Sequence, residues 1–176
     1  MNEEPDYHYY IRTLTRKGSF EVLDSEKRRW AFLDYQSWFS QRAGGEANGQ
    51  ELAILPQNIF HSKFDILLDG EDVGDLIFNW KSQMIIRLLD YQRQDRQYLL
   101  RVRGVFKQRF ILEDDIKNPI LELKPKFNWA KMRYDFKVYL QETQYLQSPV
   151  EPMMAVCAYA VNLNLKRKSS SAAGSS

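Results

Sequence analysis

The C-terminal stretch EPMMAVCAYAVNLNLKRK, residues 151–168, constrains the fold more than any other part of the sequence. Residues 153–161 carry no charge and show no polar face, and a basic cluster follows the stretch. Glu151 and Pro152 suit the first turn of a helix, and the cations suit its last turn. We therefore predict a hydrophobic helix over about 152–166. A strand is the alternative, because AVNLNLK alternates between apolar and polar residues.

A membrane is not the expected surrounding of this helix. A helix that spans a bilayer needs about 20 consecutive apolar residues, and Asn162 and Asn164 interrupt the run at roughly half that length. A helix that lies on a membrane needs one strongly polar face, and this stretch has none until its end. A helix that is apolar on every side is typically surrounded by protein, so we expect the rest of the chain to enclose it.

The rest of the chain predicts strands. Apolar and polar residues alternate in runs that are bounded by Asp, Asn, Gly and Pro, which is the pattern of β-hairpins. Phe64, Ile66 and Leu68 alternate in this way before an Asp-Gly turn. The four hairpin segments are residues 19–35, 64–80, 84–104 and 109–126. Residues 41–50 hold three glycines among polar neighbours, and we predict a loop there.

The clearest strand is KMRYDFKVYL, residues 131–140. One face is predicted to be buried and the other to face water, as in a sheet with one dry side. The residues of the buried face are Met132, Tyr134, Phe136, Val138 and Leu140. The residues of the wet face are Lys131, Arg133, Asp135, Lys137 and Tyr139.

These runs amount to about ten to twelve strands, which is enough for a sheet to close on itself. A closed sheet has no free edges, and the apolar helix can fill its interior. We therefore predict a mainly β fold, a closed antiparallel β-barrel of about 12 strands around a C-terminal hydrophobic central helix. The prediction is one domain over residues 1–168, followed by a disordered Ser-rich tail at 169–176.

Charge and cysteine content limit the classes of function. The formal net charge is +2, so nothing marks the whole chain as a nucleic-acid binder. Cys157 is the one cysteine, which excludes an intramolecular disulfide and suits a reducing compartment. Its apolar neighbours predict a small buried hydrophobe. The N-terminus MNEEPDYHYY lacks the apolar region of a signal peptide, so we expect a cytoplasmic protein.

Together these features resemble the tubby C-terminal-like superfamily, which holds the tubby proteins, the phospholipid scramblases and the plant LURP-one-related proteins. The similarity is greatest to the LURP-one-related group and covers most of residues 7–165. It is carried by SFEVLDSEKRRWAFLDY (19–35), FDILLDGEDVGDLIF (64–78), RFILEDDIKNPILEL (109–123) and MMAVCAYAVNLNL (153–165). The resemblance implies a barrel wrapped around its C-terminal helix and a function without catalysis.

The resemblance also implies a kind of partner. Tubby members bind phosphoinositide head groups and scramblase members act at membranes, so a binding or scaffold module at a membrane surface is implied. No head-group motif of the tubby proteins is legible in this chain. The cysteine-rich, lipidated segments of the scramblases are also missing, because the chain has a single cysteine.

The sequence shows no motif for catalysis, a cofactor or a metal. His8 and His61 are far apart, and neither has the spacing of a metal ligand. DGEDVGD, residues 69–75, lacks the ligand order and closing Glu of an EF-hand and is predicted to be a hairpin turn. A Gly-rich phosphate loop and a serine nucleophile elbow are missing. We therefore expect a protein that is not an enzyme.

Two groups of basic residues are the candidate site for an anionic head group. They are Arg101, Arg103 and Lys107, with Arg109 close by, and then Lys124, Lys126, Lys131, Arg133 and Lys137. Phe127 and Trp129 interleave with the second group. The expected partner is an anionic lipid or membrane surface rather than nucleic acid, for a monomer that is peripheral at the membrane. The alternative is a solvated outer face that keeps a barrel soluble.

Two other functions remain open at this point. A calycin-like barrel would carry a small apolar ligand in an empty interior, with residues 153–165 packed outside. An enzyme would need an acid–base pair or a nucleophile, and none stands out in the sequence.

Overall fold

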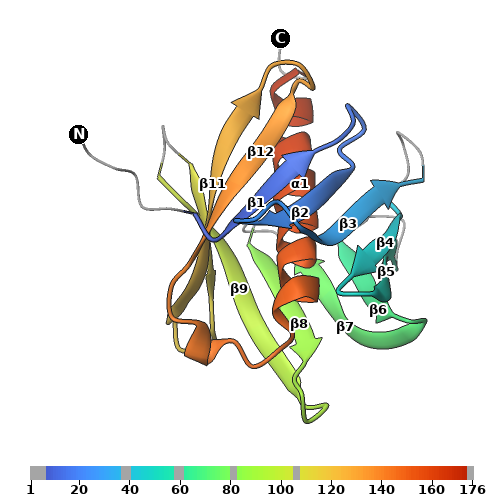
Figure 1. The fold of residues 1–176 in the computed structure, drawn as a ribbon, viewed down its shortest axis with the longest axis vertical. Coiled ribbons are helices and arrows are strands. Elements are labelled where there is room, and N and C mark those ends of the chain that lie inside the picture. Colours follow the sequence, from blue (N-terminus) through green and yellow to red (C-terminus); the bar gives the residue numbers. More distant parts are fainter. Residues whose placement is uncertain (1–6, 37–40, 58–61, 80–82, 105–107, 174–176) are drawn as a thin grey trace.

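A closed barrel of twelve antiparallel strands surrounds one long α-helix, α1, in the part of the chain that the computed structural model describes. The described residues are 7–36, 41–57, 62–79, 83–104 and 108–173. Each strand pairs with its neighbours in sequence, and β1 closes the barrel by pairing with β12. Figure 1 shows α1 running through the middle of the barrel. This architecture confirms the fold predicted from the sequence.

The strands are short and follow one another closely. They are β1 (Tyr9–Thr13), β2 (Phe20–Asp24), β3 (Arg29–Tyr35), β4 (Ala43–Ala47), β5 (Gln50–Pro56), β6 (Lys63–Leu68), β7 (Glu71–Phe78), β8 (Met84–Leu89), β9 (Asp95–Arg103), β10 (Arg109–Glu113), β11 (Pro119–Asn128) and β12 (Arg133–Leu140). The helices are η1, a 3-10 turn at Thr143–Tyr145, and α1 (Val150–Ala173).

Burial alternates along the wall as the period of a strand requires. In β6, Phe64 and Ile66 are fully buried, whereas Asp65 between them is partly exposed. The inward residues of adjacent strands meet in register, as Ile54 of β5 meets Ile66. The alternating runs predicted from the sequence therefore form the inner face of the barrel.

Helix α1 fills the interior with apolar side chains. Every residue from Met153 to Val161 is at most 1% exposed. The hydroxyl of Tyr159 donates a hydrogen bond of 2.6 Å to the carbonyl oxygen of Gln41, and its ring stacks on Tyr35. Removing so much apolar surface from water is the main stabilising term of such a core. The prediction of a central hydrophobic helix is confirmed, and the strand alternative is wrong.

The helix is longer than the predicted range of 152–166. It begins at Val150 and continues to Ala173, so residues 169–173 are helical rather than part of a disordered tail. A helix that is already nucleated extends at little cost, and the Ser169 hydroxyl donates a 2.8 Å hydrogen bond to the Lys166 carbonyl oxygen. Residues 174–176 lie outside the described residues. No helix in the described part of the chain has the length and apolar content needed to cross a membrane.

Residues 41–50 are not the predicted loop, because β4 occupies Ala43–Ala47. Both alanines of β4 are buried, and α1 packs against β3, β4 and β8. A Cβ atom built on Gly45 would lie 2.0 Å from the carbonyl oxygen of Phe32. The small residues of this segment therefore reflect close packing of backbones, which the turn preference of glycine concealed.

The start of β12 also differs from the prediction. Met132, predicted to point inward, lies in the preceding turn and is 59% exposed. Asp135, predicted to face water, is buried and accepts hydrogen bonds from Tyr10 Oη at 3.0 Å and from the Thr13 backbone N–H at 2.8 Å. The inward positions Phe136 and Val138 are confirmed.

Three hairpin turns share one construction around an aspartate. In β2–β3, Asp24 Oδ1 accepts 2.9 Å hydrogen bonds from the backbone N–H groups of Glu26 and Arg28. Asp90 and Asp114 make the equivalent pairs of bonds in β8–β9 and β10–β11. The fourth residue of each turn has a positive φ: 63° at Lys27, 60° at Arg93 and 71° at Lys117. The prediction of Asp-bearing turns is confirmed at these places.

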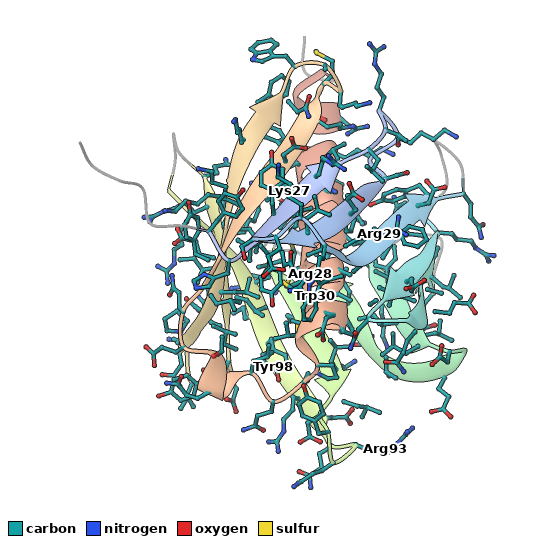
Figure 2. All side chains as sticks on the ribbon, in the orientation of Figure 1. Lys27, Arg28, Arg29, Trp30, Arg93 and Tyr98 are labelled. Atoms are coloured by element: carbon teal, nitrogen blue, oxygen red, sulfur yellow. The ribbon has the colours of Figure 1, made fainter. Side chains whose placement is uncertain are left out.

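The barrel has two different ends, named here from the view of Figure 1. The lower end is where α1 begins, and it carries the β2–β3, β4–β5, β6–β7, β8–β9 and β10–β11 connections. The upper end is where α1 ends, and it carries the other six strand connections. At the lower end, the Tyr98 hydroxyl lies 3.1 Å from Ser148 Oγ and fixes the chain before α1. Figure 2 shows Tyr98 on this side and Arg93 at the tip of the β8–β9 hairpin.

Candidate functional site

Part of the predicted basic set lies on the outer face of β9 to β12. Arg103 lies directly opposite Arg109, and Lys124 lies directly opposite Lys137. The register between β10 and β11 continues one pair into the other, so the four cations form a transverse row. Like charges at opposite positions destabilise a sheet, and an anion placed on the row would relieve that cost.

Carboxylates on the same face offset much of this charge. Arg101 Nε lies 2.9 Å from Glu113 Oε2, an ion pair without hydrogen-bond geometry. Arg103 Nη2 lies 3.1 Å from Glu113 Oε1, and Arg109 Nη1 lies 3.2 Å from Glu122 Oε1. Partly exposed pairs of this kind each contribute only about 0–1 kcal/mol. The pairing still reduces the charge that the row can offer to a ligand.

Two lysines of the strand face lie over aromatic rings. Lys124 Nζ lies 4.3 Å from the centre of the Tyr139 ring, and Lys137 Nζ lies 5.6 Å from that of Tyr7. Lys126 lies opposite the buried Asp135. The strand face therefore fits the alternative of a solvated outer surface better than that of a preformed ligand site. Lys107 lies outside the described residues.

The charge of the barrel is nevertheless one-sided. Residues 95–140 hold 11 Lys and Arg against 6 Asp and Glu, whereas residues 43–89 hold 3 against 7. A net charge of +2 conceals this division. The strands β9 to β12 and the upper end beside them are therefore the side that an anionic surface would attract.

A small pocket opens at the upper end, where α1 leaves the barrel. It has room for about one water-sized group, so a ligand would place a single small group in it. The pocket joins the β1–β2 turn, the start of β12 and the last turns of α1. We call it the upper pocket, and its lining residues are Lys17, Gly18, Tyr35, Gln41, Arg133, Asn162, Leu163 and Lys166.

Three cations from three separate elements line this pocket. Lys17 comes from the β1–β2 turn, Arg133 from β12 and Lys166 from α1. Arg133 Nε donates a 2.9 Å hydrogen bond to the carbonyl oxygen of Arg16, which holds β12 against that turn. Burial lowers the pKa of Lys166, and the nearby charge of Arg133 lowers it further. The folded barrel therefore holds like charges together at this point.

Two buried polar atoms of the upper pocket make no hydrogen bond within the described residues. They are the amide oxygen of Gln41 and the amide nitrogen of Asn162. A buried donor without a partner is costly, and such groups call for a bound water, ion or ligand. The Asn162 donor and the three cations together can hold an anionic oxygen.

A second groove lies on the outside of β1 to β3, at the lower end. Its polar side chains form hydrogen bonds with one another. Asp24 Oδ2 accepts hydrogen bonds from Arg28 Nε at 2.7 Å and from Trp30 Nε1 at 2.9 Å. Figure 2 shows Arg28 and Trp30 close together near the middle of the view. Burial alone would raise the pKa of Asp24, but the bonds from Trp30 and Arg28 lower it to about 2. The imidazole of His8 accepts the backbone N–H of Leu140 at 3.1 Å.

Metal and thiol chemistry find little support in the described residues. Among them, no group of three His, Cys, Asp or Glu could hold a metal ion. The thiol of Cys157 is fully buried, and burial raises its pKa. It packs as a small hydrophobe, as predicted. His61 lies outside the described residues.

Sequence reasoning found only part of the upper pocket. Arg133 was predicted, but Lys17, Asn162 and Lys166 were not. The basic cluster at residues 166–168 is the signal in the sequence that points to Lys166, but the helix dipole explains such a cluster equally well. Comparisons with family models, with curated proteins and with solved structures gave no match to this chain.

Proposed function

We propose that this protein is a non-enzymatic binding module of the tubby C-terminal-like kind, cytoplasmic and peripheral at a membrane, whose upper end recognises anionic phospholipid head groups. The upper pocket is the observation that supports this proposal most directly. There Lys17, Arg133 and Lys166 line the pocket with the amide donor of Asn162, which has no hydrogen-bond partner among the described residues. A phosphate or carboxylate oxygen is the natural acceptor for such groups.

The charge of the upper end supports the same partner. The sequences that connect strands at this end contain no Asp or Glu: residues 14–19, 36–42, 57–62, 79–83, 104–108 and 129–132. At the lower end, four of the five strand connections contain at least one acidic residue. Each Lys or Arg close to an anionic membrane is worth about 1 kcal/mol. The barrel would therefore approach such a membrane with its upper end.

A carrier of a small apolar ligand is the weaker candidate. A calycin-like carrier needs an empty interior, and the side chains from Met153 to Val161 occupy that space. An enzyme is weaker still, because the upper pocket pairs cations with amide groups rather than an acid with a base.

The test is sedimentation with phosphatidylcholine vesicles that contain, or lack, phosphatidylserine or phosphoinositide. The triple variant Lys17→Glu, Arg133→Glu, Lys166→Glu removes the cations of the upper pocket. Three such charges are worth about 3 kcal/mol together, so binding to anionic vesicles should weaken by about 100-fold. Circular dichroism establishes that the variant is folded.

A matched control is available at the lower end. Lys27→Glu, Arg93→Glu, Lys117→Glu makes the same change in charge at equivalent turn positions. It should keep most of the binding, because these three turns join the strands at the ends opposite those that form the upper pocket. The proposal fails if wild type ignores anionic vesicles, or if both triple variants lose binding equally. Lys124→Glu with Lys137→Glu then tests the strand face separately.

A further inference from the structure

The β11–β12 hairpin presents apolar side chains to solvent at the upper end. Its strands reach the same end as the C-terminus of α1 (Figure 1). In the turn, Trp129 is 78% exposed and Met132 is 59% exposed. The other two large hydrophobic residues exposed in the described part of the chain, Tyr91 and Ile116, lie in lower-end turns. The hairpin tip, defined as residues 129–132, therefore stands out at the basic end.

The tip is held in place from below. The Phe127 ring meets Trp129 edge-on at 4.8 Å and meets Tyr134 edge-on at 5.1 Å. The Lys131 backbone N–H donates to the Asn128 side-chain oxygen at 3.2 Å. Contacts of this kind fix the turn, so the exposure of Trp129 belongs to an ordered structure.

The backbone at Met132 shows that its side chain is an unusual choice. Residues with a positive φ outside glycine are uncommon, and Asn, Asp and Gly suit the position best. The residues of this kind in the described chain are Lys27, Asn48, Asp69, Arg93, Lys117 and Met132. Met132 is the apolar member of that set, and it is also exposed. A methionine there gains little from folding, so its side chain calls for another partner.

Basic residues surround the apolar tip. Lys131 lies within it, and Arg133 follows Met132 directly and lines the upper pocket. The nearest carboxylate along β12 is Asp135, which is buried and accepts bonds from Tyr10 and Thr13. Tryptophan prefers the layer between lipid head groups and acyl chains, and lysine stems can lie along apolar surface with the charge in water.

We propose that the hairpin tip is a wedge that inserts Trp129 and Met132 into the interfacial layer of an anionic bilayer. This inference rests on the proposed function, and it adds an apolar anchor to the charged contact. A turn with two exposed apolar side chains is convex and small. A stable protein interface needs about 800 Å² on each partner, whereas a shallow anchor in a membrane need only reach about 5–10 Å into its surface.

The wedge and the upper pocket can act together. Met132 and Arg133 are consecutive, so a lipid head group at the pocket and acyl chains at the tip would belong to the same membrane surface. Charge would bring the barrel to the membrane, and insertion would make binding resistant to salt.

The experiment compares two double variants on vesicles of phosphatidylcholine and phosphatidylserine, at low and high salt. Trp129→Ser with Met132→Asn removes the wedge, and asparagine keeps the positive φ acceptable. Tyr91→Ser with Ile116→Asn is the matched control, because these residues are 76% and 73% exposed at the lower end. The wedge variant should bind about 30-fold more weakly and lose its binding at high salt, whereas the control should match wild type.

A second measurement follows the tip directly. Brominated acyl chains should quench the tryptophan emission of wild type, and Trp129→Phe should lose most of that quenching. If wild type binds but the wedge variant binds equally well and Trp129 is not quenched, the wedge is overturned while the proposed function stands. If wild type does not bind anionic vesicles, the proposed function fails and the wedge with it. Binding to polyglutamate that requires Trp129, without vesicle binding, would assign the tip to an acidic protein partner and also overturn the wedge.

Discussion

The two ends of the barrel differ in how well the fold satisfies their polar and apolar groups. At the lower end, Asp24, Asp90 and Asp114 each close a turn by accepting two backbone N–H groups. At the upper end, cations line a pocket with two amide atoms that make no hydrogen bond in the described part of the chain, and Trp129 and Met132 are exposed to solvent. Figure 1 shows that the same helix joins the two ends.

This difference indicates that one end of the barrel contributes mainly to stability and the other mainly to binding. Turns that satisfy their own backbone groups stabilise the fold. Like charges in proximity, unpartnered polar atoms and exposed apolar side chains all cost stability. Proteins tend to keep such costly features where function needs them. The lower end therefore holds the barrel together, and the upper end is where a partner is to be sought.

The largest effect should come from cutting the helix at its lower end. A chain that stops before Met153 loses the core of the barrel and should be unfolded or aggregated. A chain that stops after Lys168 keeps the buried part of α1 and should melt like wild type. Circular dichroism melting of the two truncations measures the contrast. A soluble, cooperatively melting chain without residues 153–176 would contradict the account of the core.

Removing a single tyrosine hydroxyl should reduce the free energy of unfolding more at the lower end than at the upper end. Tyr98 Oη accepts the backbone N–H groups of Gln147 and Ser148 at 3.2 Å. Tyr98→Phe leaves the buried Ser148 donor unpaired and should cost about 1–3 kcal/mol. Among the described residues Tyr159 Oη makes one bond, to the Gln41 carbonyl oxygen, and Tyr159→Phe should cost about 0.5–1.5 kcal/mol. Denaturant unfolding measures both. Equal losses, or the reverse order, would remove this distinction between the ends.

The lower end should also determine how the fold responds to acid. The pKa of Asp24 is about 2 in the folded protein, below its ordinary value of 3.8. Asp24 therefore binds protons more readily when unfolded, and its stabilising effect is lost as the pH falls from about 4 to about 2. Asp24→Asn should flatten the pH dependence of Tm in that window. Lys131→Gln, at the upper end, should leave it unchanged; a flat profile in wild type would contradict the role of Asp24.

The smallest effect on stability should come from Lys166. Its replacement should stabilise the fold at neutral pH, whereas the replacement of Asp24 should destabilise it. Burial and Arg133 lower the pKa of Lys166, so its charge is disfavoured in the folded state and stability should recover as the pH rises toward the ordinary value of 10.5. Lys166→Met should therefore raise Tm slightly at neutral pH, by a change within about 0.5 kcal/mol, while weakening binding to anionic vesicles. A variant that loses both stability and binding would show that Lys166 is structural.

The sequence predicted what depends on periodicity. The period of two gave the barrel wall, the uncharged run gave the central helix, and aspartates marked three of the turns. The loop predicted at residues 41–50 was wrong, because glycine occurs both in loops and where two backbones pack closely. The predicted burial of Met132 was wrong because β12 begins only at the next residue. The predicted exposure of Asp135 was wrong because β1, which is far away in the sequence, covers it.

The candidate site was less predictable than the fold. Counting charges along the chain found Arg133 and the cations of β9 to β12. It could not find that Lys17 and Lys166 join Arg133, because the three residues meet only when the barrel closes around α1. Nor could it show that Glu113 and Glu122 offset the strand face, since cross-strand register determines those pairs.

The orientation of the barrel on a membrane tests the central claim most directly. A spin label at Lys131→Cys reports on the upper end, and one at Lys117→Cys reports on the lower end; Cys157 is fully buried and should not compete for the label. Collision with oxygen, which dissolves in lipid, is compared with collision with a water-soluble nickel chelate on phosphatidylserine-containing vesicles. The account predicts that the label at position 131 gains oxygen contact and loses nickel contact, while the label at position 117 changes little. Equal behaviour of the two labels, or immersion of position 117 instead, would contradict it.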